Sequence, residues 1–146
     1  MLTRLPSTVA EIMTREVVTV DENETLVDLM RSLHTLRFRH LPVTDDDRLI
    51  GLLSERDLLA VASSSLLPHQ ERDDRLLLER FRVHDIMTRD LVTVPPDALI
   101  ADAGRILLER RFGCVPVVDA TNILLGIVTS SDFTRLIVDA QREPGR

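Results

Sequence analysis

The stretch IMTREVVTV at residues 12–20 returns as IMTRDLVTV at residues 86–94, 74 positions further along the chain. At this offset residues 9–45 align with residues 83–119 without a gap, and 16 of the 37 pairs are identical. A repeat of this length indicates a fold built from two similar units. The repeat must therefore be identified before single helices and strands are assigned. Most of the chain is therefore two copies of one unit of about 50 residues, each too small to close a good core alone.

The copies continue in register past one inserted residue, at an offset of 75. This offset pairs Ser54 with Thr129 and Asp57 with Asp132. The sequence predicts a first repeat at residues 7–62, a connector at 63–82 and a second repeat at 83–140.

Composition narrows the class of protein. The 146 residues are 44% hydrophobic, which is normal for a globular protein, and no apolar run approaches a membrane span. The net charge of −6 disfavours nucleic-acid binding, and four Phe without Trp or Tyr offer few platforms for stacking bases. A single cysteine, Cys114, rules out an internal disulfide, and the N-terminus shows no secretion signal. We expect a cytoplasmic protein without membrane or nucleic-acid partners.

Each copy has the pattern of strand, helix, strand, strand, helix. The β-branched residues 17–20 and 91–94 predict the first strands, and a Leu-Pro-Val or Val-Pro-Val segment predicts a second strand that proline places at an edge or a strand end. A polar turn at 45–48 predicts a hairpin. Thr8 and Glu11 have the spacing of a capping box, and Cys114 is expected to be a small buried residue.

The predicted helices carry apolar faces at helical spacing, and these faces predict a homodimer. The expected contact residues are Leu26, Leu29, Met30 and Leu33 in the first copy and Ile100, Ala103, Ile106 and Leu107 in the second.

Both copies end in the same signature, Gly51 to Asp57 (GLLSERD) and Gly126 to Asp132 (GIVTSSD). With the threonine-bearing first strands and the proline segments, this tandem unit resembles the pair of cystathionine β-synthase (CBS) domains, or Bateman module, over about residues 7–140. The resemblance implies an α+β fold of two β-α-β-β-α repeats packed about a pseudo-twofold axis into one module. It also implies clefts between the repeats that bind adenosine-containing ligands.

The pairs Ser54/Asp57 and Thr129/Asp132 admit two interpretations. Ser or Thr three residues before an acid is a capping box. A helix N-terminus also suits a phosphate, and a carboxylate in its first turn can accept both hydroxyls of a ribose. By resemblance, Ser54 and Thr129 lie near the phosphate and the two aspartates on the ribose, and both interpretations can hold together.

The complete set of ligand-binding candidates follows from family position. It is Thr19, Arg39, His40, Leu41, Pro42, Ser54, Arg56 and Asp57 in the first copy, and Thr93, Cys114, Val115, Pro116, Thr129 and Asp132 in the second. The main chain around the proline segments is expected to contact the base, and the first copy carries more cations for a phosphate. Threonine as an ordinary strand former and arginine as a solvated surface residue are the competing explanations.

The resemblance implies a stand-alone regulatory module, not an enzyme, with AMP, ADP or ATP as regulatory ligand and NAD or S-adenosyl compounds as further candidates. Occupancy would change the shape of the module or of its dimer. The alternative is a dimerisation scaffold with degenerate clefts. No His or Cys spacing predicts a metal site, no catalytic set stands out, and the regulated protein partner cannot be named from the sequence.

Overall fold

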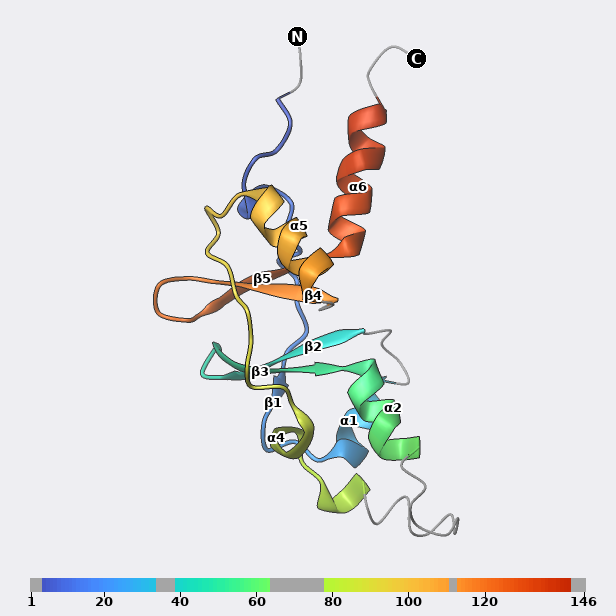
Figure 1. Cartoon of the computed structure of the whole chain (residues 1–146). Coiled ribbons are helices and arrows are strands. Elements are labelled where there is room, and N and C mark those ends of the chain that lie inside the picture. The colour runs from blue at the N-terminus through green and yellow to red at the C-terminus, as the bar shows by residue number, and fades with distance from the viewer. Residues whose placement is uncertain (1–3, 34–38, 64–77, 111–112, 143–146) are drawn as a thin grey trace. The chain divides into compact units, whose positions relative to one another are not determined.

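The computed structural model describes residues 4–33, 39–63, 78–110 and 113–142 (Figure 1). Most of the expected connector lies outside these residues. The elements are η1 (Val9–Glu11), β1 (Val20–Asp21), α1 (Leu26–Leu33), β2 (His40–Asp45), β3 (Arg48–Ser54), α2 (Glu55–Ser63), α4 (Val83–Ile86), α5 (Ile100–Glu109), β4 (Cys114–Val118), β5 (Leu124–Thr129) and α6 (Ser130–Gln141). Within the described ranges, no helix is both long and apolar enough to cross a membrane.

The chain divides into two compact units that differ from the two sequence copies. Unit 1 combines residues 1–17 with residues 92–146, and unit 2 is residues 18–91. The first segment of each copy therefore packs in the unit that holds the rest of the other copy. Thr14 forms a backbone bridge with Ile127 of β5 in unit 1. The corresponding threonine, Thr88, bridges to Leu52 of β3 in unit 2.

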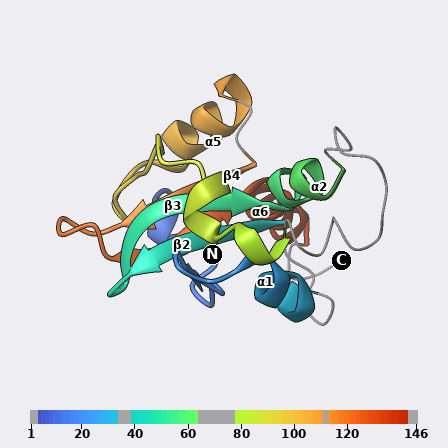
Figure 2. The same ribbon diagram turned by 90° about the horizontal axis from the view of Figure 1, so that it is seen from below.

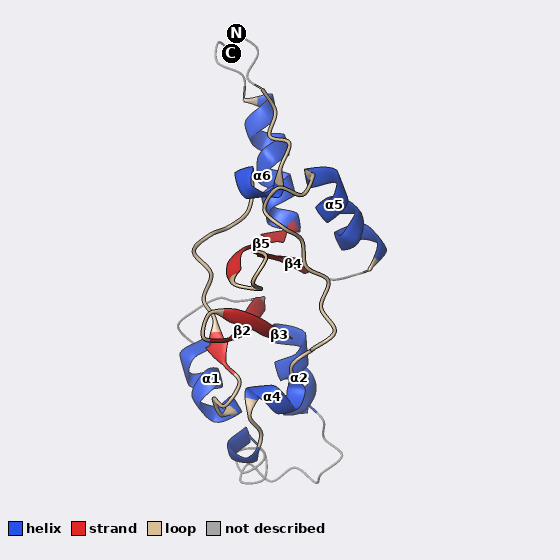
Figure 3. Cartoon of the chain, turned by 90° about the vertical axis from the view of Figure 1, so that its left-hand side faces the viewer, coloured by secondary structure: helices blue, strands red, loops and turns tan. Residues whose placement is uncertain are grey.

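Unit 2 is built on a three-stranded sheet in the order β1-β2-β3. β1 runs parallel to β2, and β2 and β3 form the predicted antiparallel hairpin. Helices α1, α2 and α4 lie on one face of this sheet (Figures 1 and 3), and Figure 2 shows α4 in front of the sheet beside β3. The core between helices and sheet includes Leu26 and Leu29 of α1, Leu53 of β3, Leu58 of α2 and Val83 of α4.

Unit 1 repeats this plan with the hairpin of β4 and β5 and the helices α5 and α6 on one face (Figures 1 and 3). Its core contains Val115 and Val117 of β4, Val128 of β5 and Ala103 of α5, together with Val9 from the first segment of the chain. Apolar residues at alternate strand positions and at helical spacing thus meet on one side of each sheet. The predicted α+β class is confirmed.

The first strand of each copy is shorter than the sequence predicts. In place of four-residue strands at 17–20 and 91–94, the structure has β1 at Val20–Asp21 and an isolated bridge at Val94. Within residues 17–20 and 91–94, only Val20 and Val94 are buried. These are the two residues that pair with a neighbouring strand, and they lie in the cores of their units.

Proline explains why these ladders begin so late. The Val94 N–H donates to the Pro116 carbonyl at 3.1 Å, and the Val118 N–H donates to the Val94 carbonyl at 3.0 Å. The next bond towards the N-terminus would need an N–H on Pro116, which proline lacks. The prediction of an edge or a strand end is wrong for Pro42, which lies inside the central strand β2. Pro116 lies inside β4, one of the two strands of the sheet β4-β5.

The two hairpin turns account for the inserted residue. Asp46 and Asp47 join β2 to β3 with φ values of 47° and 64°, as a tight two-residue turn requires. In the second hairpin, Asn122 has φ 68°, and the Asp119 carboxylate accepts hydrogen bonds from the Thr121 N–H at 2.9 Å and from the Ile123 N–H at 3.0 Å. The second turn is one residue longer, which changes the repeat offset from 74 to 75.

Gly126 and Gly51 give a first prediction. A Cβ at Gly126 would lie 2.6 Å from the backbone oxygen of Thr14, whereas at Gly51 its nearest contact, at 2.5 Å, would be the Met87 sulfur, which can rotate away. The Thr14 backbone is held by two hydrogen bonds to Ile127. We expect Gly126→Ala to lower the free energy of unfolding by about 1–3 kcal/mol and Gly51→Ala by less. Urea denaturation checks both, and an equal loss would contradict the rigid contact.

Candidate functional site

In unit 2, the end of the hairpin and the start of α2 gather the first-copy candidates. His40 and Ser54 form the last pair of the β2–β3 ladder. The Glu55 N–H then donates to the Arg39 carbonyl at 3.0 Å, so α2 begins directly beside the start of β2. Asp57 follows in the first turn of this helix.

The Asp57 carboxylate is half-buried, and only one of its two oxygens accepts a hydrogen bond from the described residues. One oxygen, Oδ2, accepts the Ser54 N–H at 2.9 Å, and the Asp57 N–H donates to the Ser54 hydroxyl at 3.1 Å. These reciprocal bonds confirm the predicted capping box. Among the residues that the structure describes, Asp57 Oδ1 accepts no hydrogen bond, so it remains able to accept a donor from a ligand.

The cationic character of this site comes from arginine. Desolvation of the half-buried His40 and the nearby charge of Arg39 lower the pKa of the imidazole, while Asp57 acts in the opposite direction. A pKa below the ordinary value leaves His40 mostly neutral at pH 7. Arg39 and Arg56 are exposed and carry fixed positive charge.

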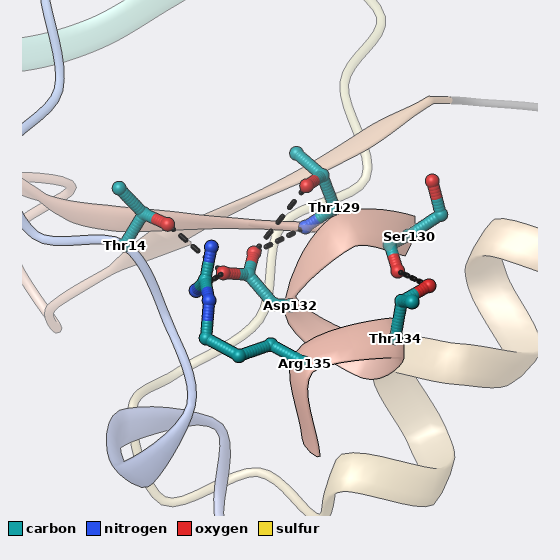
Figure 4. A network of polar contacts seen from close by, with 6 residues as sticks. All are labelled: Thr14, Thr129, Ser130, Asp132, Thr134 and Arg135. Carbon is teal, nitrogen blue, oxygen red and sulfur yellow. Dashed lines mark hydrogen bonds and ion pairs between the residues drawn. The ribbon is translucent and has the colours of Figure 1, made fainter. Parts of the chain in front are cut away.

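In unit 1, the corresponding aspartate has a different environment, which Figure 4 shows. Asp132 is buried, with 3% of its surface exposed. Its Oδ1 accepts the Thr14 hydroxyl at 2.9 Å and the Arg135 guanidinium at 3.2 Å (Figure 4). Its Oδ2 accepts the Thr129 N–H at 2.8 Å and the Thr129 hydroxyl at 3.4 Å (Figure 4). This carboxylate is thus held by the beginning of the chain, by the end of β5 and by α6.

Cys114 lies at the position that His40 occupies in the other copy. It pairs with Thr129 in the β4–β5 ladder and is buried. Burial, assisted by the negative charge of Asp132, raises the pKa of the thiol to about 12. The thiol therefore stays protonated near neutral pH, and the prediction of a small buried cysteine is confirmed.

Four of the candidates can offer a ligand only their main chain. Leu41, Pro42, Val115 and Pro116 are buried in the units' interiors. Of the backbone groups expected to contact a base, the Pro116 carbonyl already accepts a hydrogen bond from the Val94 N–H.

The two threonines of the repeated stretch lie just before the first strands. Thr19 is exposed and precedes Val20, while Thr93 is half-buried and precedes Val94. Among the described residues, no hydrogen bond joins the hydroxyl of Thr19 or Thr93 to Asp57 or Asp132. Their assignment to a ligand stays a prediction.

Thr14 and Arg135 are the polar residues that sequence reasoning missed. Arg135 stands three positions after Asp132, a spacing that brings side chains together on a helix, and this signal was visible. Thr14 lies 118 residues from Asp132, and no local pattern links them.

The CBS domain family matches this chain twice, at residues 9–64 and 83–139. These matches span most of the chain, which therefore belongs to the CBS domain family as a tandem pair. The resemblance carried by the repeated signature is confirmed.

Particular relatives fall into whole-chain and partial matches. The solved structure of CBSX2 from Arabidopsis thaliana in complex with AMP is 30% identical, with a TM-score of 0.78, and covers 94% of this chain and 100% of that one. The cytosolic domain of the Mg²⁺ channel MgtE in complex with ATP is 30% identical with a TM-score of 0.66, covering 85% of this chain and 46% of that one. Protein MJ0188 of Methanocaldococcus jannaschii is 34% identical over 129 residues, and this chain spans 43% of its length.

Enzymes also contain this module as a part. Inosine-5′-monophosphate dehydrogenase of Thermoplasma acidophilum is 32% identical over 123 residues, which make up 22% of that enzyme. Similarity to the enzyme is thus confined to a minor portion of its length.

Proposed function

We propose that this protein is a regulatory module that binds an adenosine nucleotide, of the AMP, ADP or ATP class, and responds to occupancy by changing its shape or its dimer. The observation that carries the proposal is the Asp57 carboxylate, which Ser54 positions at the start of α2 with one oxygen available. A ribose diol can donate to such an oxygen, and charge-assisted bonds of this kind are strong.

The surroundings of Asp57 suit the remainder of a nucleotide. The exposed Arg39 and Arg56 offer positive charge for a phosphate. Arg39 directly precedes His40, and Arg56 directly precedes Asp57. The first turn of α2 adds N–H groups and a partial positive charge. CBSX2, which is similar to this chain over nearly its whole length, binds AMP, and the MgtE domain binds ATP. NAD and S-adenosyl compounds belong in the same screen.

A thermal-shift screen tests this proposal. A ligand at 100 times its dissociation constant contributes about 2.7 kcal/mol of stability. We expect at least one of AMP, ADP and ATP to raise the melting temperature by several degrees. Ribose 5-phosphate, which lacks the base, is the matched control and should give a smaller shift. If no adenosine compound shifts the melting temperature at millimolar concentration, the alternative of a ligand-free scaffold is favoured.

We also propose a homodimer, in which three of the eight contact residues that the helical pattern suggested cannot take part. Leu26, Leu29 and Ala103 are buried inside their own units and cannot form an interface. Exposed apolar side chains lie instead on α5 and α6, at Leu108, Ile137 and Val138.

Oligomeric state can be measured directly. Burial of these apolar side chains would favour association. We expect light scattering at tens of micromolar to give twice the chain mass and Ile137→Glu to shift the protein towards monomer. A monomeric wild-type protein would contradict the dimer, and an unchanged dimer in Ile137→Glu would exclude this surface.

A further inference from the structure

The two aspartates of the repeated signature differ in how many of their acceptor positions are used. A carboxylate offers about four lone-pair sites. Asp132 accepts four hydrogen bonds from three residues, whereas Asp57 accepts one from Ser54. Both copies therefore carry an aspartate at this position, but the two carboxylates differ in how many hydrogen bonds they already accept.

We infer that Asp132 is a structural tie between the start of the chain and α6, and that each chain binds one nucleotide, through Asp57. The inference rests on the proposed function and selects between its two candidate sites.

Competition at Asp132 is the first argument. A ribose diol would have to displace the Thr14 hydroxyl or the Arg135 guanidinium, the two donors on Oδ1. The Thr14 hydroxyl, which is half-buried, would then lose its acceptor, and such losses oppose binding. At Asp57 a ligand would fill an acceptor position that no described residue uses, so no internal bond has to break.

The charge around the two carboxylates points the same way. Arg135 pairs with Asp132, and at the offset of 75 its equivalent in the first copy is Ala60. Asp57 thus has no arginine at i+3. Arg135 thus compensates the negative charge of Asp132, whereas no residue at i+3 compensates that of Asp57, which stays available to a ligand hydroxyl.

Three further substitutions remove functional groups from the second site. The positions of Arg39, His40 and Arg56 are taken by Gly113, Cys114 and Ser131. Two fixed positive charges are lost, and an imidazole is replaced by a buried thiol. Of these three residues in unit 1, Cys114 is buried, Gly113 and Ser131 are exposed, and none carries a positive charge, whereas the two arginines of unit 2 suit a phosphate.

Equilibrium dialysis with radiolabelled AMP tests the stoichiometry without any mutation. We expect saturation at one AMP per chain. Asp132→Asn should change AMP affinity by no more than about twofold, because this residue does not touch the ligand. Two AMP per chain, or a tenfold loss of affinity in a folded Asp132→Asn protein, would overturn the inference.

Melting temperatures test the structural role separately. Asp132→Asn should melt at least about 4 °C below Asp57→Asn, because it weakens several buried charged hydrogen bonds. Equal melting temperatures would refute the tie. If Asp132→Asn does not fold, Thr14→Val gives the second readout: a lower melting temperature with unchanged AMP affinity supports the tie, and weakened binding overturns it. If the wild type binds none of AMP, ADP and ATP, the proposed function is contradicted, while the melting temperatures would still decide the role of Asp132.

Discussion

Replacing Leu26 with alanine is expected to lower the free energy of unfolding by about 2–5 kcal/mol. Leu26 is fully buried and packs in the core of unit 2, so the substitution removes apolar surface and leaves a cavity. The loss should not depend on protein concentration, because the contact lies inside one chain. Chemical denaturation at two concentrations checks both the magnitude and this independence.

Leu59 on α2 is the matched control in the same unit, since 56% of its surface is exposed. Leu59→Ala should change stability by no more than about 0.5 kcal/mol. If Leu26→Ala cost as little as Leu59→Ala, or if its effect appeared only at dimer-forming concentrations, Leu26 would be an interface residue, as the helical pattern first suggested.

Local signals in the sequence predicted much of this architecture. The duplicated IMTR stretch and the Gly51 to Asp57 signature indicated a tandem α+β unit, because a repeat of this length marks two copies of one structural unit. The polar turn at 45–48 predicted a hairpin, and Thr8 with Glu11 predicted a cap. The cap also explains why two backbone N–H donors, on Thr8 and Ser7, lower the pKa of Glu11 to about 2.

Long-range features could not be predicted in the same way. The pairing of Thr14 with Ile127 and Asp132 spans more than a hundred residues and has no periodic signal. The helical spacing that placed Leu26 and Ala103 on apolar faces was correct. It does not say whether such a face meets its own sheet or a second molecule, and here it meets the sheet.

Asp57→Asn is expected to weaken nucleotide binding at least tenfold and to leave the fold nearly intact. The asparagine carbonyl can still accept the Ser54 N–H, and a charge at a helix start is worth only about 0.3–1 kcal/mol. A ligand hydroxyl on the available oxygen would lose a charge-assisted bond of roughly 1.5–3 kcal/mol. A tenfold change in affinity corresponds to about 1.4 kcal/mol.

Glu55→Gln is the control, because it removes the same charge from the same helical turn at an exposed residue. Its affinity should stay within about twofold of the wild type. An equal loss in both variants would mean that the general charge of the helix start matters, and not the Asp57 carboxylate. Circular dichroism of both variants confirms that the fold is retained.

Titration calorimetry of the wild-type protein and Asp57→Asn with AMP, ADP and ATP tests the central claim most directly. We predict a saturable heat with at least one of the three nucleotides for the wild type, and a dissociation constant at least tenfold higher for the variant. No saturable heat with any of them at millimolar concentration, or equal affinities in a folded variant, would contradict binding through Asp57.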